Sequence, residues 1–284
     1  MGQRTRPGAV AVVGAGTMGV GIAYVFAAAG HETLVVEPDA ARRDAAVRVV
    51  AEQAAAGVRR GKLDDAAARD LGARVRCVEA IDALPVDLEL LVESVPERLA
   101  LKQDVLRAAE ARGPALLASN TSSLSIDALA DRLERPEAFC GMHFFNPVWS
   151  LKLVEVVRGT ATSDAAVEHA RALTAGIGKQ AIVARDVAGF ATSRLDVVAA
   201  LEAIRMLEDG VASAEDIDRA ATLAYRHPVG PLRLSDIVGL DVRLDIAEHL
   251  SGVYGARFAV PGLLRRKVAA GELGQKSGRG FFAW

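Results

Sequence analysis

The stretch Val10-Ala11-Val12-Val13-Gly14-Ala15-Gly16-Thr17-Met18-Gly19 decides the fold of this chain. A short β-branched run ends in a Gly-x-Gly-x-x-Gly loop, and a helix rich in small residues is expected over Thr17–Ala29. In this pattern Gly14 allows the tight turn, Gly16 lets the backbone approach a pyrophosphate, and Gly19 lets the helix pack closely on the strand. The free N–H groups at the start of the helix then face the phosphates. The stretch predicts a dinucleotide-binding unit; the alternative is a glycine-rich turn that binds nothing.

The acid Glu37, at the end of a second expected strand, bears on the choice of cofactor. It follows Gly19 by about 18 residues, near the usual interval of ~20 residues for the acid that accepts a hydrogen bond from the ribose 2′-hydroxyl. Its charge would repel a 2′-phosphate, so NAD is favoured over NADP. Arg42 and Arg43 lie close enough to keep NADP as the alternative.

Length and composition bound the class of protein. The chain has 284 residues, enough for two domains, since single cores rarely grow much beyond ~250 residues. A net charge of −2 gives no overall field that would attract nucleic acid or an anionic membrane. Residues 1–8 hold no apolar segment typical of a signal peptide, and Cys77 and Cys140 are too few for a disulfide framework or a zinc site. These features favour a cytoplasmic protein without a metal.

Strands and helices alternate along the first two thirds of the chain, which predicts right-handed crossovers and a mostly parallel sheet. The expected strands are Ala9–Val13, Thr33–Val36, Val75–Val78, Leu88–Val92, Ala115–Ala118, Phe139–Phe144, Leu153–Val157 and Gln180–Val183. From Asp186 on, helical segments follow one another without clear strands. The expected helices are Phe190–Glu208, Glu215–Ala224, Arg233–Val238, Asp241–Leu250 and Pro261–Ala269. We therefore expect an α/β fold, with a Rossmann-type sheet domain over residues 1–185 and an all-α domain over residues 186–284. The helical domain is apolar enough to suggest a homodimer through this half.

A polar loop follows the expected strand Ala115–Ala118, at the edge where open α/β sheets bind ligands. Within it, Ser122 could hydrogen-bond a substrate oxygen, or it could cap a helix beginning near Ser125. Asn120 could contact the nicotinamide side of the cofactor, or it could only hold the turn. The loop is therefore a candidate for both cofactor and substrate contacts.

His143 and Glu155 are the candidates for acid–base chemistry. His143 lies near the end of one expected strand, and Glu155 lies in the next, flanked by leucine and valines. A carboxylate in such surroundings is costly to bury unless a group pairs with it. A histidine suits this role, because the carboxylate would fix the ring tautomer and stabilise the imidazolium. The alternative is a structural histidine, with Glu155 facing solvent.

A small basic cluster, Arg59, Arg60 and Lys62, follows a long expected helix that begins at Ala40. It suits a phosphate-bearing ligand, and a solvated helix end is the alternative.

Six motifs in this order resemble those of the 3-hydroxyacyl-CoA dehydrogenases, especially the short 3-hydroxybutyryl-CoA dehydrogenase type. The motifs are Val13–Gly19, Ser119–Leu124, Gly141–Pro147, Lys152–Val156, His227–Leu232 and Gly278–Phe282. The resemblance covers nearly the whole chain. It implies reversible oxidation of an (S)-3-hydroxyacyl thioester by NAD, and a helical second domain that makes the dimer.

The resemblance also implies roles for single residues. His143 matches the family's catalytic histidine, Glu155 its partner, and Ser122 the serine that hydrogen-bonds the substrate's 3-oxygen, while Glu97 and Lys102 match cofactor contacts. The expected catalytic residues are therefore His143, Glu155, Ser122 and Ser193, and the expected cofactor contacts are Gly14, Gly16, Thr17, Met18, Gly19, Glu37, Glu97, Lys102 and Asn120.

Two departures from the family pattern bear on the substrate. Ser193 stands where the family has an asparagine, and its shorter side chain lacks the amide donor. Trp149, close to His143 in sequence, could narrow the acyl pocket or merely pack. The group that carries the thioester also has two alternatives, CoA and an acyl carrier protein. CoA would place its phosphates on Arg59, Arg60 and Lys62, and an acyl carrier protein would present an acidic helix to them. A free hydroxy acid substrate, or a catalytically silent NAD-binding protein, are further alternatives.

Overall fold

The computed structural model of this chain describes residues 7–284. Its backbone divides into two compact units, with the division between Val187 and Ala188. This division lies close to the boundary expected after Arg185.

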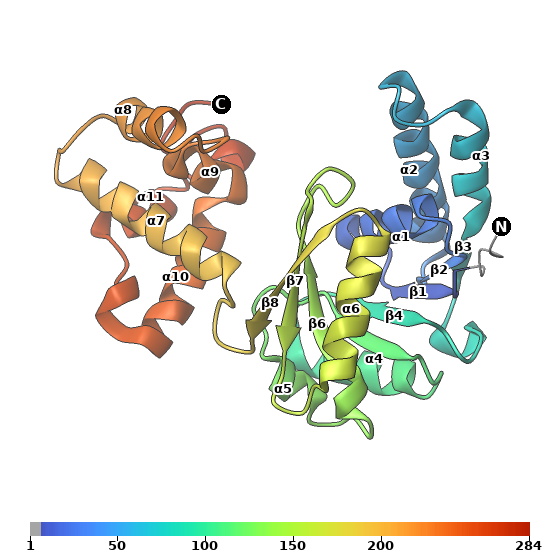
Figure 1. Cartoon of the computed structure of the whole chain (residues 1–284). Coiled ribbons are helices and arrows are strands. Elements are labelled where there is room, and N and C mark those ends of the chain that lie inside the picture. Colours follow the sequence, from blue (N-terminus) through green and yellow to red (C-terminus); the bar gives the residue numbers. More distant parts are fainter. Residues whose placement is uncertain (1–6) are drawn as a thin grey trace. The chain divides into compact units, whose positions relative to one another are not determined.

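An eight-stranded sheet forms the centre of unit 1, in the order β3-β2-β1-β4-β5-β6-β7-β8 (Figure 1). Its strands are β1 (Val10–Val13), β2 (Thr33–Val36), β3 (Val75–Val78), β4 (Leu90–Glu93), β5 (Leu116–Ser119), β6 (Phe139–Phe144), β7 (Leu153–Arg158) and β8 (Gln180–Arg185). Neighbouring strands in this sheet are parallel except for β6 and β7, which are antiparallel. The mostly parallel, Rossmann-type sheet expected from the sequence is thus confirmed.

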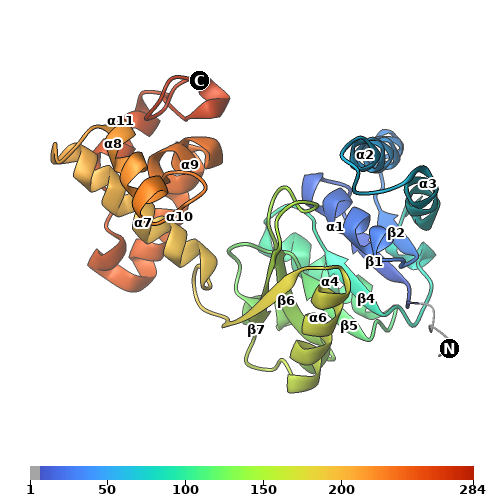
Figure 2. The same ribbon diagram turned by 45° about the horizontal axis from the view of Figure 1, so that its top comes forward.

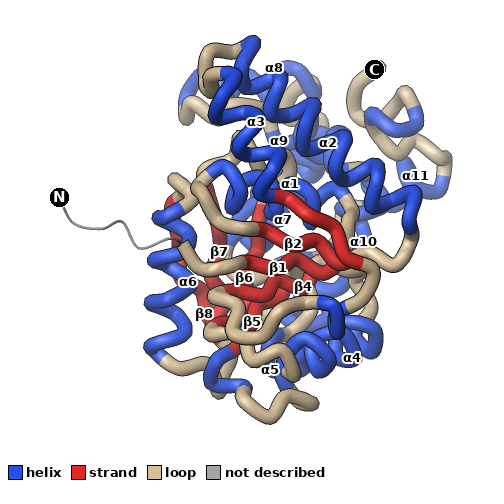
Figure 3. The backbone as a smooth tube through the Cα atoms, turned by 90° about the vertical axis from the view of Figure 1, so that its right-hand side faces the viewer, coloured by secondary structure: helices blue, strands red, loops and turns tan. Residues whose placement is uncertain are grey.

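Helices lie on both faces of the sheet (Figure 3). These helices are α1 (Thr17–Ala28), α2 (Ala40–Arg59), α3 (Asp65–Arg74), α4 (Leu99–Glu110), α5 (Ile126–Ala130) and α6 (Asp164–Gly176). Helices α2 and α3 lie side by side (Figure 2). The carboxylate of Asp39 caps the start of α2 by accepting a hydrogen bond from the amide of Arg42.

The alternation of side chains along β6 decides where its histidine points. Cys140, Met142 and Phe144 belong to the hydrophobic cluster that they form with residues of α1 and α6. Because successive side chains of a strand point to opposite faces, His143 lies on the other face of the sheet.

Unit 2 contains the helices α7 (Thr192–Glu208), α8 (Ala214–Arg219), α9 (Pro231–Val238), α10 (Leu240–Tyr254) and α11 (Gly262–Ala269), drawn from yellow-orange to red in Figure 1. Its core includes Leu201, Ile204, Leu232, Leu250 and Leu264, all fully buried. This confirms the expected all-α second half.

Two helix boundaries in unit 2 differ from expectation. The helix expected from Phe190 begins at Thr192, because Gly189 and Phe190 have φ of 72° and 46°, which a right-handed helix does not allow. The helix expected through Ala224 ends as α-helix at Arg219 and continues as a π-helical turn. Within residues 7–284, no helix is long and apolar enough to span a membrane.

The buried thiol of Cys140 gives a test of the fold. Burial raises the pKa of this thiol to about 12, and the half-buried thiol of Cys77 also has a raised pKa, mainly because of burial. Since the thiolate is the reactive form, we expect iodoacetamide at pH 8 to leave Cys140 unmodified in the folded protein and to modify Cys77 slowly. Mass spectrometry of labelled peptides measures both. A Cys77→Ala variant serves as the control, and rapid labelling of that variant without denaturant would contradict this fold.

Candidate active site

Four neighbouring strands of unit 1 place their carboxyl ends at one edge of the sheet. Val13 of β1 lies opposite Glu93 of β4, Glu93 opposite Ser119 of β5, and Ser119 opposite Gly141 of β6. A cavity of about 1210 Å³ opens at this edge. Its lining includes the glycine-rich loop, Glu37, Glu97, Lys102, Asn120, Ser122 and His143. The cavity therefore collects most of the site residues that the sequence predicts in this half of the chain.

The three glycines of the loop have distinct geometries. Gly14 has φ of 108°, and a Cβ there would lie 2.6 Å from the carbonyl oxygen of Ser94. A Cβ on Gly19 would lie 1.9 Å from the carbonyl oxygen of Gly14, so the close approach of helix and loop requires glycine. At Gly16 a Cβ would meet nothing within 4 Å, and this residue lines the cavity. The loop thus leaves open space beside Gly16.

The start of α1 suits a negatively charged ligand. Gly16 is its N-cap residue, provides no side-chain cap, and is followed by no acidic residue in the first turn. The amides and the positive end of the helix dipole therefore meet no competing carboxylate from the helix itself. This arrangement fits the pyrophosphate of a dinucleotide.

The carboxylate of Glu37 lies beside the same loop. It accepts hydrogen bonds from the amide of Ala15, at 3.3 Å, and from the amide of Asp39, at 3.1 Å. Arg43 donates to the carbonyl oxygens of Glu37 and Pro38, so its guanidinium is engaged locally. An acid held at the loop fits recognition of a ribose diol, as the sequence predicts.

His143 and Glu155 lie directly opposite each other on the antiparallel pair β6–β7. Nδ1 of His143 lies 3.1 Å from Oε2 of Glu155. Glu155 is 0% exposed, so the alternative in which this carboxylate faces solvent is wrong. The ring of Phe145 packs against the imidazole, with centroids 4.3 Å apart. The two groups that sequence reasoning paired are thus in contact at the cavity.

The loop after β5 is hydrogen-bonded to β6 at the cavity. Asn120 accepts a hydrogen bond from the amide of Phe144, next to His143, at 2.9 Å through Oδ1. Asn120 therefore holds the turn and also lines the cavity. The cap of α5 is Ser125, which accepts a hydrogen bond from the amide of Ala128. This leaves Ser122, exposed at the cavity, without the capping role considered from sequence.

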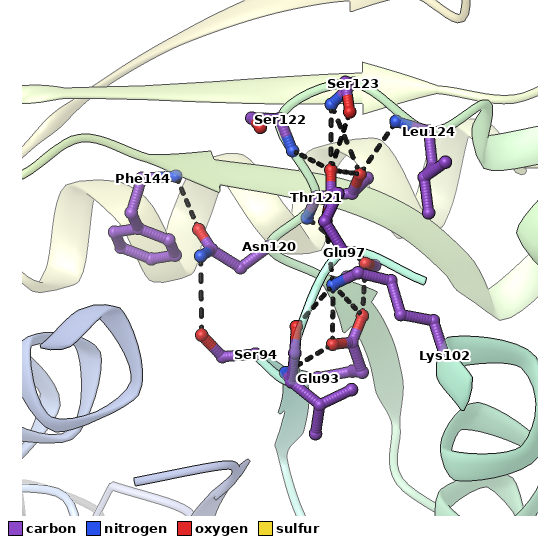
Figure 4. A network of polar contacts seen from close by, with 12 residues as sticks. Glu93, Ser94, Glu97, Lys102, Asn120, Thr121, Ser122, Ser123, Leu124 and Phe144 are labelled. Carbon is purple, nitrogen blue, oxygen red and sulfur yellow. Dashed lines mark hydrogen bonds and ion pairs between the residues drawn. The ribbon is translucent and has the colours of Figure 1, made fainter. Parts of the chain in front are cut away.

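Glu97 and Lys102 take part in a polar network beneath this loop (Figure 4). Burial alone would raise the pKa of Glu97, but hydrogen bonds from Thr121 and Ser123 and the charge of Lys102 outweigh it and lower this pKa. Lys102 is almost fully buried and pairs with the equally buried Glu93. Sequence reasoning missed Glu93, which looked like the polar end of an apolar run. Its partner Ser119 ends the neighbouring strand, and only the sheet register shows that the two side chains meet.

The remaining candidates lie elsewhere. Arg59, Arg60 and Lys62 are exposed at the end of α2 and the following turn, where positive charge also suits the negative end of the helix dipole. Trp149 is half-buried and packs edge to face on Tyr24, with centroids 6.2 Å apart. Ser193 lies in the first turn of α7, in unit 2.

Residues 9–187 match the family described as 3-hydroxyacyl-CoA dehydrogenase, NAD binding domain, and residues 189–284 match its C-terminal domain. A 3-hydroxybutyryl-CoA dehydrogenase of Mycobacterium tuberculosis is 40% identical over 281 residues, which cover 97% of this chain and 98% of the relative. One of Bradyrhizobium diazoefficiens is 37% identical over 276 residues, 96% of this chain and 94% of the relative.

A solved structure agrees with this family assignment. The crystal structure of (S)-3-hydroxybutyryl-CoA dehydrogenase from Ralstonia eutropha superposes with a TM-score of 0.93 and 36% identity. The match covers 97% of this chain and 98% of that one. The glycine-rich loop with Glu37 therefore belongs to an NAD-binding domain, and the chain is a member of the 3-hydroxyacyl-CoA dehydrogenase family.

Proposed function

We propose that this protein interconverts (S)-3-hydroxyacyl and 3-oxoacyl thioesters, with NAD as the hydride acceptor and a 3-hydroxybutyryl-CoA-like substrate. The observation that carries the proposal is the buried contact between His143 and Glu155 at a cavity that also contains the glycine-rich loop. Membership of the family and relatives named as 3-hydroxybutyryl-CoA dehydrogenases support it.

His143 is the proposed general acid–base group. When Nδ1–H donates to Glu155, the lone pair of the imidazole lies on Nε2. That nitrogen takes the proton of the substrate's 3-hydroxyl, and the O–H electrons become the second bond of the C3 carbonyl as hydride leaves C3. The imidazolium that forms is stabilised by the Glu155 carboxylate. In the reductive direction the imidazolium returns its proton to the 3-oxygen.

NAD, when bound, supplies the hydride acceptor at C4 of its nicotinamide ring. The residues proposed to hold it are those of the glycine-rich loop, Glu37 at the ribose, and Asn120, Glu97 and Lys102 near the nicotinamide end. Ser122 is proposed to hydrogen-bond the substrate's 3-oxygen, which would polarise C3 and orient it. In unit 2, Ser193 is proposed to provide a weaker substrate contact than the family asparagine.

Replacing His143 tests the acid–base role. We expect His143→Gln to bind NADH as the parent protein does and to lose turnover by a factor of ~10²–10⁴, because a positioned acid–base group contributes that order. NADH oxidation with acetoacetyl-CoA measures turnover, and fluorescence titration measures NADH binding. His169→Gln, the same change on α6 outside the cavity, is the control and should be neutral. Normal turnover of His143→Gln would remove the histidine from the mechanism.

Replacing the basic cluster distinguishes between the candidate substrates. If CoA phosphates bind Arg59, Arg60 and Lys62, replacing all three by glutamine should raise KM for acetoacetyl-CoA about tenfold or more, since a charge-assisted hydrogen bond contributes about 1.5–3 kcal/mol. The KM for acetoacetyl-N-acetylcysteamine, which lacks the phosphates, should not change.

Two comparisons complete this test. Glutamine at the exposed Arg107, Arg132 and Arg171 of unit 1 removes as much charge elsewhere and should leave both KM values unchanged. A matched acetoacetyl carrier protein, assayed beside acetoacetyl-CoA, tells which carrier depends on the cluster. If replacing the basic cluster leaves KM unchanged for acetoacetyl-CoA and for the acetoacetyl carrier protein, the result would favour the alternative function, a dehydrogenase of a free hydroxy acid.

We also propose a homodimer through unit 2 and a cytoplasmic location. Large apolar side chains are exposed on the helices of this unit, among them Leu195 (71%), Ile237 (48%) and Val242 (40%). Apolar side chains in such number favour burial against another surface. Both cysteines are free, which suits a reducing compartment.

The proposed homodimer predicts the mass of the protein in solution. Sedimentation equilibrium should give about twice the chain mass of 29.8 kDa. The double variant Leu195→Glu, Ile237→Glu should shift the mass toward the monomer, because two charges would be buried on each side of the interface. Val47→Glu, at an exposed apolar position of unit 1, is the control and should stay dimeric. A parent protein that sediments as a monomer would contradict the dimer.

A further inference from the structure

The carboxylate of Glu93 is fully buried at the cavity edge of the sheet and makes four strong contacts (Figure 4). Its Oε1 accepts from Nζ of Lys102 at 2.7 Å and from the amide of Val95 at 2.6 Å. Its Oε2 accepts from Oγ of Ser119 at 2.6 Å and again from Nζ of Lys102 at 3.0 Å. A carboxylate removed from water is tolerated only with such compensation.

The ammonium group of Lys102 connects Glu93 to a second acid, Glu97. This group contacts Glu93, the carbonyl oxygen of Val95 at 3.1 Å, and Oε2 of Glu97 at 3.2 Å. An ammonium group has three N–H donors, so these three partners account for all of them. Lys102 therefore has its position set by Glu93 and in turn sets the position of Glu97.

Glu97 is the link to the loop after β5. Its other oxygen, Oε1, accepts hydrogen bonds from Oγ1 of Thr121 at 2.6 Å and from the amides of Ser122 at 3.0 Å and Ser123 at 3.1 Å. Oγ of Ser123 donates to the same atom at 3.0 Å. One carboxylate oxygen thus gathers two backbone amides and two hydroxyls of the loop that carries Ser122.

A second, shorter route leads from Glu93 to the same loop. The hydroxyl of Ser119, which donates to Glu93, accepts a hydrogen bond from the amide of Thr121 at 3.2 Å. The backbone carbonyl of Glu93 accepts from the amide of Asn120 at 2.8 Å. Asn120 then accepts from Phe144 beside the histidine. Both routes connect Glu93 to the loop that carries Ser122.

We propose that Glu93 is a positioning residue for the dehydrogenase reaction: through Lys102 and Glu97, and through Ser119, it holds the Ser119–Leu124 loop so that Ser122 meets the 3-oxygen of the substrate. This inference rests on the proposed function, because the role of Ser122 belongs to it. Stability alone gives a weak reason for such a network, since buried ion pairs contribute little to stability relative to apolar side chains of similar volume.

The first experiment follows the loop without substrate. In Glu93→Gln the carboxylate charge is lost, so Lys102 and Glu97 are no longer fixed and amide hydrogen exchange in the Ser119–Leu124 peptide should rise about tenfold or more. Leu106→Ala, a fully buried position on α4, is the control: it should lower Tm without changing exchange in that peptide. Unchanged exchange in Glu93→Gln would overturn the proposal.

The second experiment is a double-mutant cycle on turnover of acetoacetyl-CoA and NADH. Glu93→Gln should lower kcat about 10- to 100-fold in the parent protein, the order that a small misplacement of a reacting group costs. In a Ser122→Ala background the same change should cost little, because both changes remove one interaction. An equal cost in both backgrounds, or a Ser122→Ala variant with normal kcat, would overturn the positioning role.

The outcomes keep the two proposals apart. A parent protein that does not turn over acetoacetyl-CoA removes the proposed function, while exchange still decides whether Glu93 holds the loop. An active parent protein whose loop loosens in Glu93→Gln without loss of kcat overturns the inference alone. If Glu93→Gln does not fold, Glu93→Asp keeps the charge but shortens the reach, and should show the same two effects with smaller size.

Discussion

The reversal of direction between β6 and β7 is the constraint on which the candidate site depends. Because these two strands are antiparallel, residues 143 and 155 lie directly opposite each other and their side chains share one face of the sheet. The segment between the strands, residues 145–152, is too short for the crossover that parallel pairing needs, which takes a dozen or more residues. The connection length therefore excludes parallel pairing, and the observed register places the carboxylate beside the imidazole.

Much of this arrangement was predictable from the sequence. The strand Phe139–Phe144 has the bounds that its apolar pattern predicts, and the glycine-rich loop has the conformation that its spacing predicts. The contact of His143 with Glu155 was one of the two alternatives that the cost of burying an acid in an apolar strand left open. These inferences succeed because each depends on local pattern or on a single strong energetic penalty.

Glu93 was not predictable in the same way. At the end of an apolar run, an acid most often marks the place where a strand emerges into solvent. Its burial depends on Lys102, which lies beyond a turn and in the first part of the next helix, and on Ser119 of the neighbouring strand. Such a network forms only when the sheet register brings Glu93 and Ser119 side by side, and register between distant strands is not written in either strand alone. The position of Ser193 was also not predictable in detail, because α7 begins only after Gly189 and Phe190, two residues with positive φ.

The two fully buried acids of the site, Glu93 and Glu155, illustrate one physical principle used for two purposes. Each would be too costly to bury without a hydrogen-bonding partner. The interaction of Lys102 with Glu93 takes no part in the proposed proton transfer and can only fix positions. His143 gains and loses a proton in the proposed chemistry, so its interaction with Glu155 is strongest when the imidazolium has formed. Only an interaction that strengthens toward the transition state accelerates the chemical step. In the proposed mechanism, the partner of each buried carboxylate therefore decides its role: Glu93, paired with Lys102, fixes positions, and Glu155, paired with His143, assists proton transfer.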